Sequence, residues 1–281
     1  MAKRNRKFDY EKMIKEGFGS GSGKDYKPWL KIQDFPSKGR VTRVKGIKTQ
    51  RQHELFSDLE RNYFYYLDFA DNVIDIREQF PLFPIEETII IAKKLGIEHP
   101  KDPVTKEPII MTTDFLITFK EQNGNIIEKA RTLKYKNDLL DKRVLEKFEI
   151  ERLYYENQNI DWGIVTEDEV DKTVSNFIAD LYTYQYLSET ESFNEIDAES
   201  IEDMKIYFIS QCASYEGSIK NLCRNFDKNM NMSIGSGIAM FKHLIISKVI
   251  NTNIFEDFDL NKNIKISIND SCDVDNIRGA S

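Results

Sequence analysis

Three side chains in the first half of the chain have the residue types and spacing to do chemistry together. Asp114 lies near the start of the apolar segment TTDFLITF (112–119), and Lys134 lies in the next segment, KARTLKYKND. Asn123-Gly124 between them favours a tight hairpin turn, so pairing of the two segments could bring both side chains to one edge of a sheet. Glu60 lies upstream on a segment with helical periodicity. An aspartate inside an apolar strand is costly unless it is paired or binds a metal, so Asp114 is the strongest candidate.

A helix-borne glutamate, a strand aspartate and a neighbouring lysine form the set used in metal-dependent phosphodiester hydrolysis. Mg²⁺ takes oxygen ligands, commonly one or two carboxylates with water and phosphate oxygens. The cation lowers the pKa of a bound water and offsets charge on the scissile phosphate, and a lysine ammonium can orient the water or stabilise the transition state. Residue types alone leave an ordinary alternative open, in which Glu60 is a solvated helix residue and Asp114 and Lys134 form a surface cross-strand pair.

The elements that would position these residues read as a compact mixed α/β unit. Periodicity predicts a helix over residues 53–69 and a short strand over 73–76 that leads into an extended turn at REQFPLFP. The segment IIIAKKLGI has no clear assignment. Two hairpin strands, a helix and a last strand are expected at residues 109–119, 126–135, 139–158 and 160–166.

After Thr166 the pattern becomes mostly helical, and we place a domain boundary near residue 168. The expected domains are therefore residues 1–168 and 169–281. The segment NKNIKISI (261–268) could supply a strand, which would form a small wing at the C-terminal end of the second domain.

Composition restricts the remaining classes of protein. The 281 residues are 40% hydrophobic and 31% charged, which favours a soluble globular chain. Neither a signal peptide nor a membrane span is expected, because no long apolar run exists. Three cysteines without CxxC spacing and three scattered histidines argue against a disulfide framework and a zinc site, and a reducing cytoplasm fits best. The glycine-rich cluster ending at Gly23-Lys24 fails as a phosphate loop, because Phe18 stands where glycine is required and Asp25 follows the lysine.

The charge is distributed unevenly, although the net charge of −7 alone would argue against nucleic acid. Residues 1–50 contain fourteen Lys and Arg against five acidic residues, so this segment carries +9 and the remainder −16. A basic arm on an acidic body is typical of a protein that binds a polyanion, although a solvated basic tail is the ordinary alternative. The residues expected to contact DNA are Lys24, Lys27, Arg40, Arg43, Lys45, Lys48 and Arg51.

Seven sequence blocks follow one another along the chain: GKDYKPWLKIQDFPSKGR, HELFSDLERNYFYYLDF, VIDIREQFPL, MTTDFL, RVLEKFEIERLYY, IDWGIVTEDE and SIGSGIAMFKHLIISKVI. In this order they resemble the TnsA family, the endonuclease subunits of heteromeric Tns transposases that move cut-and-paste transposons. The resemblance covers nearly the whole chain and implies a restriction-endonuclease-like mixed sheet flanked by helices, followed by a mostly helical, winged-helix-like C-terminal domain.

The resemblance also implies a function and partners. It implies cleavage at the 5′ ends of the transposon, a TnsB-type transposase subunit that cuts and joins the 3′ ends, and docking on a TnsC-type AAA+ regulator. The family's metal-binding glutamate and aspartate and its lysine fall on Glu60, Asp114 and Lys134. The expected cofactor is Mg²⁺, for which Mn²⁺ should substitute.

One departure from the family pattern concerns the position two residues before the lysine. Restriction-type nucleases carry Asp or Glu at this position, and TnsA proteins, which otherwise resemble them, have Gln. This chain has Thr132, whose hydroxyl is shorter and uncharged. One metal site could therefore be weaker, while the backbone carbonyl of Leu133 could still serve as a ligand. Two rival functions stay open: a stand-alone restriction or repair nuclease of the same fold, and a catalytically decayed assembly subunit that bridges transposase and regulator.

Three further residues are secondary candidates, each with an ordinary alternative. Glu149 could be an outer-shell metal ligand or a solvated helix residue. His53, placed on the same helix as Glu60, could touch phosphate. Gln79 could contact the site or the DNA, or only shape a turn. Trp29 and Trp162 are assigned to packing.

Overall fold

The computed structural model describes residues 9–34, 40–212, 215–254, 259–262 and 266–269. The chain divides into two compact units, Met1–Ser175 and Asn176–Ser281. This division lies seven residues after residue 168, near which the sequence pattern changes. The units are described separately below.

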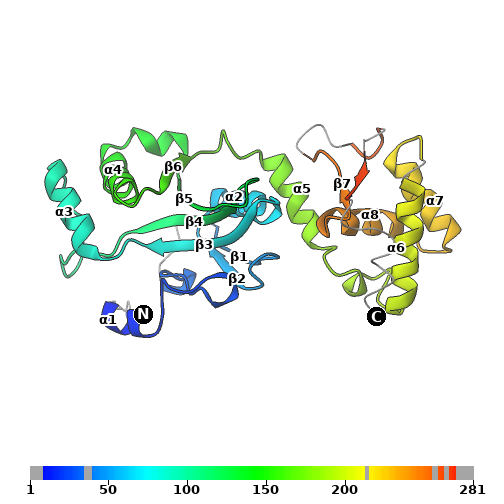
Figure 1. The fold of residues 1–281 in the computed structure, drawn as a ribbon, viewed down its shortest axis with the longest axis horizontal. Helices are drawn as coiled ribbons and strands as arrows, with labels where there is room; N and C mark the ends of the chain where they lie inside the picture. Colours follow the sequence, from blue (N-terminus) through cyan, green and yellow to red (C-terminus); the bar gives the residue numbers. More distant parts are fainter. Residues whose placement is uncertain (1–8, 35–39, 213–214, 255–258, 263–265, 270–281) are drawn as a thin grey trace. The chain divides into compact units, whose positions relative to one another are not determined.

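A four-stranded mixed sheet forms the centre of the first unit (Figure 1). Neighbouring strands follow the order β3-β4-β5-β6; the first three are antiparallel, and β6 pairs parallel to β5. The predicted hairpin turn is confirmed, with Gly124 at φ 87°, a conformation that glycine adopts without strain. The strands are β3 (Val73–Pro81), β4 (Thr112–Lys120), β5 (Ile126–Leu133) and β6 (Asp161–Val165).

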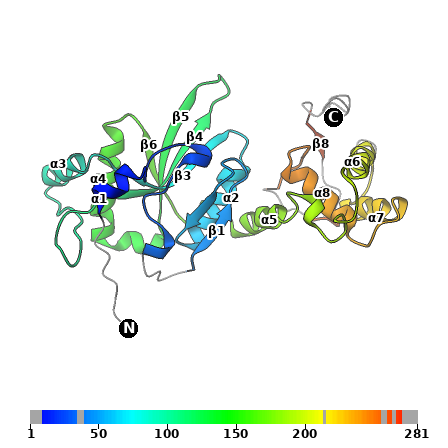
Figure 2. The ribbon, with the colours of Figure 1, turned by 90° about the horizontal axis from the view of Figure 1, so that it is seen from below.

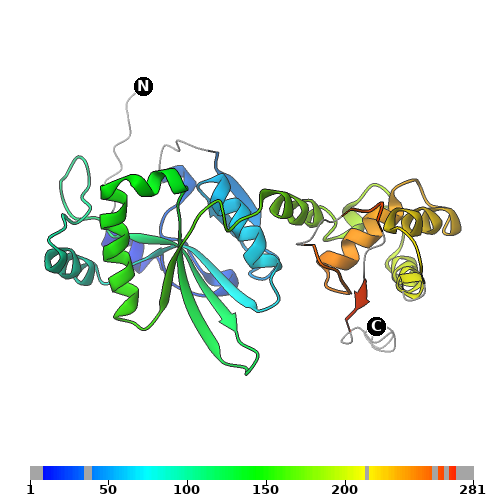
Figure 3. The ribbon, with the colours of Figure 1, turned by 90° about the horizontal axis from the view of Figure 1, so that it is seen from above.

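Helices cover both faces of this sheet, as Figures 2 and 3 show. On one face, α4 (Lys142–Glu156) and α3 (Ile85–Leu95) pack on the strands through a cluster that includes Ile150, Leu116 and Ala130. On the other lies α2 (Asp58–Phe69), next to the two-stranded sheet of β1 (Thr42–Lys45) and β2 (Gln52–Leu55). The expected mixed sheet flanked by helices is confirmed.

Several predicted element boundaries are wrong. The helix expected from residue 53 begins at Asp58, because Ser57 caps its N-terminus, and His53 belongs to β2. The strand expected over 73–76 continues to Pro81, through the predicted turn. The unassigned IIIAKKLGI lies largely within α3. The next helix begins at Lys142, capped by Asp141, so Leu140 lies outside it and is exposed.

The N-terminal segment, which contains the glycine-rich cluster, packs on the sheet. Trp29 is 1% exposed and Tyr26 is 3% exposed, which agrees with the packing role predicted for Trp29. The tyrosine hydroxyl donates to the main-chain oxygen of Glu78 in β3 at 3.0 Å. The helical turns here are α1 (Tyr10–Lys15), η1 (Gly23–Asp25) and η2 (Ile32–Asp34).

The second unit is mostly helical, as expected. The ring of Phe208 lies 5.3 Å from that of Phe226 and 6.4 Å from that of Phe241, which places a small aromatic core between three helices. The strand predicted over residues 261–268 lies partly outside the described residues. Its last two residues, Ser267 and Ile268, pair antiparallel with β7. The winged-helix likeness stays a prediction. The elements are α5 (Lys172–Tyr182, which crosses the division), η4 (Leu187–Glu189), α6 (Ala198–Cys212), α7 (Ile219–Asn229), α8 (Ser236–Ile246), β7 (Ile250–Asn251) and β8 (Ser267–Ile268).

Each of the described helices is too short or too polar to span a bilayer.

Candidate active site

One pocket of the first unit brings the three predicted catalytic residues together. It has a volume of about 580 Å³ and lies where α2, the adjoining ends of β4 and β5, and α4 meet. Glu60, Asp114 and Lys134 all line it, although they are far apart in the chain. Its wall also includes Thr132, Leu133, Asp138, Lys147, Phe148 and Glu151.

Glu60 is the third residue of α2 and is only 6% exposed, so the solvated helix residue of the alternative interpretation is excluded. The Glu60 carboxylate accepts from the Ser57 hydroxyl at 2.9 Å and from the Phe56 N–H at 2.9 Å. In return, the backbone N–H of Glu60 donates to the Ser57 hydroxyl oxygen. This capping arrangement anchors the side chain at the N-terminus of the helix. Burial, with the nearby charge of Asp114, raises the pKa of Glu60 to about 8.

Asp114 is held in place by the end of the neighbouring strand. Its Oδ2 accepts from the Leu133 N–H at 2.6 Å, and its Oδ1 lies 3.4 Å from the side-chain nitrogen of Gln79. Burial raises the pKa of Asp114 to about 6, although the Leu133 N–H, Gln79 and the charge of Lys134 favour the ionised form. The half-buried side chain therefore has a donor beside each of its carboxylate oxygens.

Lys134 directly follows β5, and its N–H donates to the Val165 carbonyl at 3.0 Å, which fixes its backbone beside β6. Its Nζ lies 3.5 Å from Asp138 on η3 (Lys136–Leu140). The surface pair expected with Asp114 under the alternative interpretation is thus replaced by a pair with Asp138, at the rim of the pocket.

A second buried carboxylate of the pocket beside Glu60, that of Glu151, was not predicted from the sequence. It is 3% exposed, and its Oε1 accepts from the hydroxyls of Thr113 and Thr132 and from Trp162 Nε1 at 3.0 Å. Burial, with the charge of Asp114, raises the pKa of Glu151 to about 8. Its sequence signal was its spacing from Phe148 and Tyr155, which puts it on the inward face of α4.

Glu149 occupies a different face of the same helix from Glu151. It pairs with Arg152 at 2.7 Å, and 40% of its side chain is exposed. It does not line the pocket, whereas Glu151 does, so Glu149 is not placed as the predicted outer-shell ligand. Thr132 is 5% exposed and its hydroxyl is directed to Glu151, which gives this side chain a partner other than a cation.

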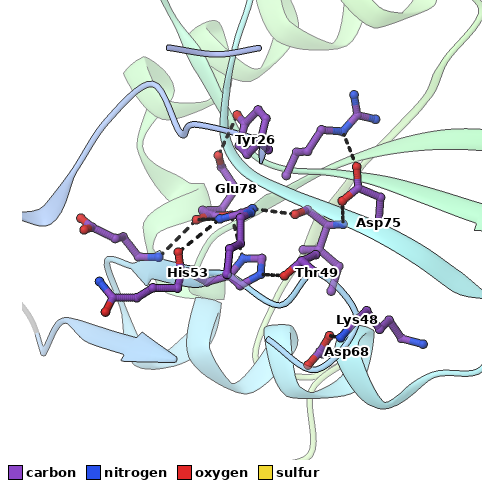
Figure 4. A network of polar contacts seen from close by, with 12 residues as sticks. Tyr26, Lys48, Thr49, His53, Asp68, Asp75 and Glu78 are labelled. Carbon is purple, nitrogen blue, oxygen red and sulfur yellow. Dashed lines mark hydrogen bonds and ion pairs between the residues drawn. The ribbon is translucent and has the colours of Figure 1, made fainter. Parts of the chain in front are cut away.

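Two other predicted contacts do not fit the structure. His53 is fully buried, with its ring nitrogens 2.7 Å from Thr49 Oγ1 and 2.8 Å from Glu78 Oε2 (Figure 4), so it is not placed to touch phosphate. Arg51 is 9% exposed and is bound to both oxygens of Glu78, so it is not available to DNA.

The other predicted DNA contacts lie nearer the surface. Lys27 donates to the Glu16 carbonyl, and Arg43 lies 3.6 Å from Glu54 on the paired strand. Their role in DNA binding stays a prediction. Lys24, Lys27, Arg40, Arg43 and Lys45 are exposed, and Lys48 is half-buried.

The pocket residues fit a hard divalent cation. In the described ranges no three His, Cys, Asp or Glu side chains gather as a metal site by themselves, so a cation here would need other oxygen donors as well. Two carboxylates with a backbone carbonyl and water are a ligand set that Mg²⁺ accepts. The raised pKa values of Glu60 and Asp114 fit as well, because a cation would offset their mutual repulsion and desolvation.

Comparison with known proteins identifies the family of this chain. A family model described as TnsA-like endonuclease N terminal matches residues 70–167, and one described as TnsA endonuclease C terminal matches residues 168–254. The chain is 35% identical over 281 residues to the Transposon Tn7 transposition protein TnsA of Escherichia coli, covering 99% of this chain and 98% of that protein. The chain therefore belongs to the TnsA family of endonucleases.

Proposed function

We propose that this protein is a Mg²⁺-dependent DNA endonuclease that cuts the 5′ ends of a transposon within a multi-subunit transposase. The observation that carries the proposal is the convergence of Glu60, Asp114 and Lys134 on one pocket from three separate elements. Membership of the TnsA family supports DNA cleavage, and the name of the Escherichia coli relative supports a role in transposition.

Asp114 and Glu60 would hold the cation, together with the backbone carbonyl of Leu133. When bound, the cation would lower the pKa of a water molecule and offset charge on the scissile phosphate. Lys134 sits at the rim, where its ammonium can leave Asp138 and donate to a phosphate oxygen or to the attacking water. Lys147, exposed on the α4 side of the same pocket, can contact a neighbouring phosphate.

DNA affinity would depend mainly on contacts to the phosphate backbone. The exposed basic residues of the N-terminal segment and of β1 carry no base-reading pattern, so binding should weaken as salt rises and should discriminate little between sequences. Choice of the transposon end would then come from partners, which we propose to be a TnsB-type transposase subunit and a TnsC-type AAA+ regulator. The described thiols, Cys212 and Cys223, are free, which is consistent with action in the cytoplasm.

The test is an end-cleavage assay with partner subunits and Mg²⁺, comparing the natural chain with Asp114→Asn. The asparagine keeps the shape of the side chain and removes its charge, so 5′ cutting should be lost. Asp161→Asn is a matched control, because this β6 aspartate is 59% exposed and lies outside the pocket. Retention of 5′ cutting by Asp114→Asn would show that the site is assigned wrongly.

The same assay separates the rival functions. Cutting by the natural chain without partners would indicate a stand-alone nuclease. Assembly with the partners but no cutting, under conditions in which the partners themselves cut the 3′ ends, would indicate a non-catalytic subunit.

A further inference from the structure

Gln79 has an unusual backbone for a residue within a strand. Its φ is +49°, and in the part of the chain that the structure describes it is the only non-glycine residue of a strand with a positive φ. Residues other than glycine, asparagine and aspartate rarely adopt this left-handed backbone conformation. Where another residue does adopt it, the surrounding structure imposes the conformation.

The conformation interrupts the alternation of β3 at this point. Arg77 and Phe80 lie on the same side of the strand, with the guanidinium 5.3 Å from the ring centre, whereas residues three apart in a regular strand face opposite sides. The register pairs Glu78 with Phe115 and Phe80 with Thr113, so Gln79 stands opposite Asp114. Its side chain is thereby directed toward that carboxylate.

The amide of Gln79 is oriented at both of its ends. Thr112 Oγ1 donates to its Oε1 at 3.3 Å, which leaves its Nε2 facing Asp114 Oδ1 at 3.4 Å. The residue is 5% exposed, so water does not compete freely for these contacts. Both distances are long for hydrogen bonds.

The residues around Gln79 impose its backbone conformation. Its carbonyl accepts from the Trp29 N–H at 3.2 Å. The preceding residue, Glu78, is fully buried between Arg51 and His53, and its carbonyl accepts from Tyr26 (Figure 4). The N-terminal segment and β2 therefore hold β3 in the shape that directs Gln79 to Asp114.

We propose that Gln79 is a positioning residue, which orients the Asp114 carboxylate toward the divalent cation. The inference rests on the proposed function. Leu133 N–H holds Oδ2 and the Gln79 amide holds Oδ1, so the two donors together fix the rotation of the carboxylate. Partners of this kind tune a ligand without touching the metal, and their loss commonly weakens metal binding.

The test compares Gln79→Gly with Gln79→Ala in the full-length chain. Glycine tolerates the positive φ and lacks the amide, so it separates the side-chain role from the backbone role, whereas alanine loses the amide and also strains the backbone. Gln50 supplies the matched control, because it also has a positive φ (54°) but is exposed and donates to the Ile47 carbonyl away from the pocket.

Two readouts are needed: Mn²⁺ affinity by calorimetry without DNA, and single-turnover cleavage with the partner subunits. Gln79→Gly should remain folded and lose about 10- to 100-fold in Mn²⁺ affinity, with a matching loss in cleavage. Gln50→Gly should change neither. Equal Mn²⁺ affinity in Gln79→Gly and the natural chain would overturn the positioning role while leaving the proposed function intact. Absence of Mn²⁺ binding by the natural chain would overturn the proposed function and this inference with it.

Discussion

Two groups of buried acids in the first unit have opposite environments. Glu78 is fully buried beside Arg51 and His53; burial raises its pKa, but the charge and hydrogen bonds of these two residues outweigh burial and lower it to about 2. Glu60 and Glu151 are similarly buried, but each accepts mainly from neutral donors, and the pKa of each is raised to about 8.

The difference separates a structural acid from candidate functional ones. A buried carboxylate with built-in cationic partners is already satisfied by the fold. Buried carboxylates that line a pocket without such partners are destabilised in their ionised form, and a bound cation can stabilise that form. Perturbed pKa values therefore cluster at functional sites. The same Glu→Gln change should therefore have opposite consequences in the two groups.

The largest effect is expected at the satisfied acid. Glu78→Gln would leave Arg51 buried without a counter-charge, and should lower the free energy of unfolding by about 3–5 kcal/mol. Urea denaturation at pH 7 measures this. A loss below about 1 kcal/mol would mean that the Arg51–Glu78 pair is not the main support of β3.

A smaller effect of opposite sign is expected at Glu151. Glutamine can still accept from Thr113, Thr132 and Trp162 and has no charge to bury, so Glu151→Gln should raise the free energy of unfolding at pH 8 without metal. One pKa unit corresponds to about 1.4 kcal/mol, and we expect a gain of at least about 1 kcal/mol. The gain should shrink near pH 5, where the natural carboxyl is already protonated. Destabilisation at pH 8 would contradict the raised pKa.

The two groups of acids should also change the free energy of unfolding in opposite directions as the pH rises. A raised folded-state pKa means that the folded chain holds protons which the unfolded chain releases, so Glu60 and Glu151 make stability fall as pH rises from about 4.5 to about 8, and Asp114 from about 4 to about 6. Glu78 acts the other way, and its contribution is lost as pH falls from about 4.5 toward 2.

Divalent cations provide the check on this profile. Mg²⁺ requires ionised ligands, so it should raise the melting temperature more at pH 8 than at pH 5, and binding should release protons. Melting curves with Mg²⁺ and with EDTA across this range measure the effect. An equal shift at both pH values would indicate that the cation binds elsewhere.

The smallest effect is expected at Glu149, which pairs with Arg152 on the solvent side of α4. Glu149→Ala should change the free energy of unfolding by less than about 1 kcal/mol and leave cleavage unchanged. A cleavage defect as large as that of Asp114→Asn would restore Glu149 as a site residue.

Local pattern was enough to predict some of the site from the sequence. Asp114 stood out as a charge in an apolar strand, and Asn123-Gly124 located the hairpin that brings Leu133 to it. Glu60 and Lys134 depended on family resemblance, because isolated charged residues on a helix or after a strand are common.

The remainder depended on tertiary contacts that no local pattern encodes. The strand β2 has only four residues, so its pattern could not be distinguished from the helical periodicity that follows it. His53 and Arg51 were therefore predicted to contact phosphate or DNA, whereas the structure pairs both with Glu78. Glu151 was passed over because a charged residue on a helix is ordinarily exposed. Gln79 was a secondary candidate that could contact the site or the DNA, or only shape a turn. Its positive φ within a strand could not be predicted, because it follows from packing around β3.

The most direct test of the central account is crystallographic. Crystals of the natural chain soaked in Mn²⁺ should show an anomalous difference peak within bonding distance of carboxylate oxygens of both Asp114 and Glu60 and of the Leu133 carbonyl oxygen. Asp114→Asn crystals treated in the same way should lack that peak. A pocket without the peak in the natural chain, with Mn²⁺ bound at some other group of residues, would contradict the account.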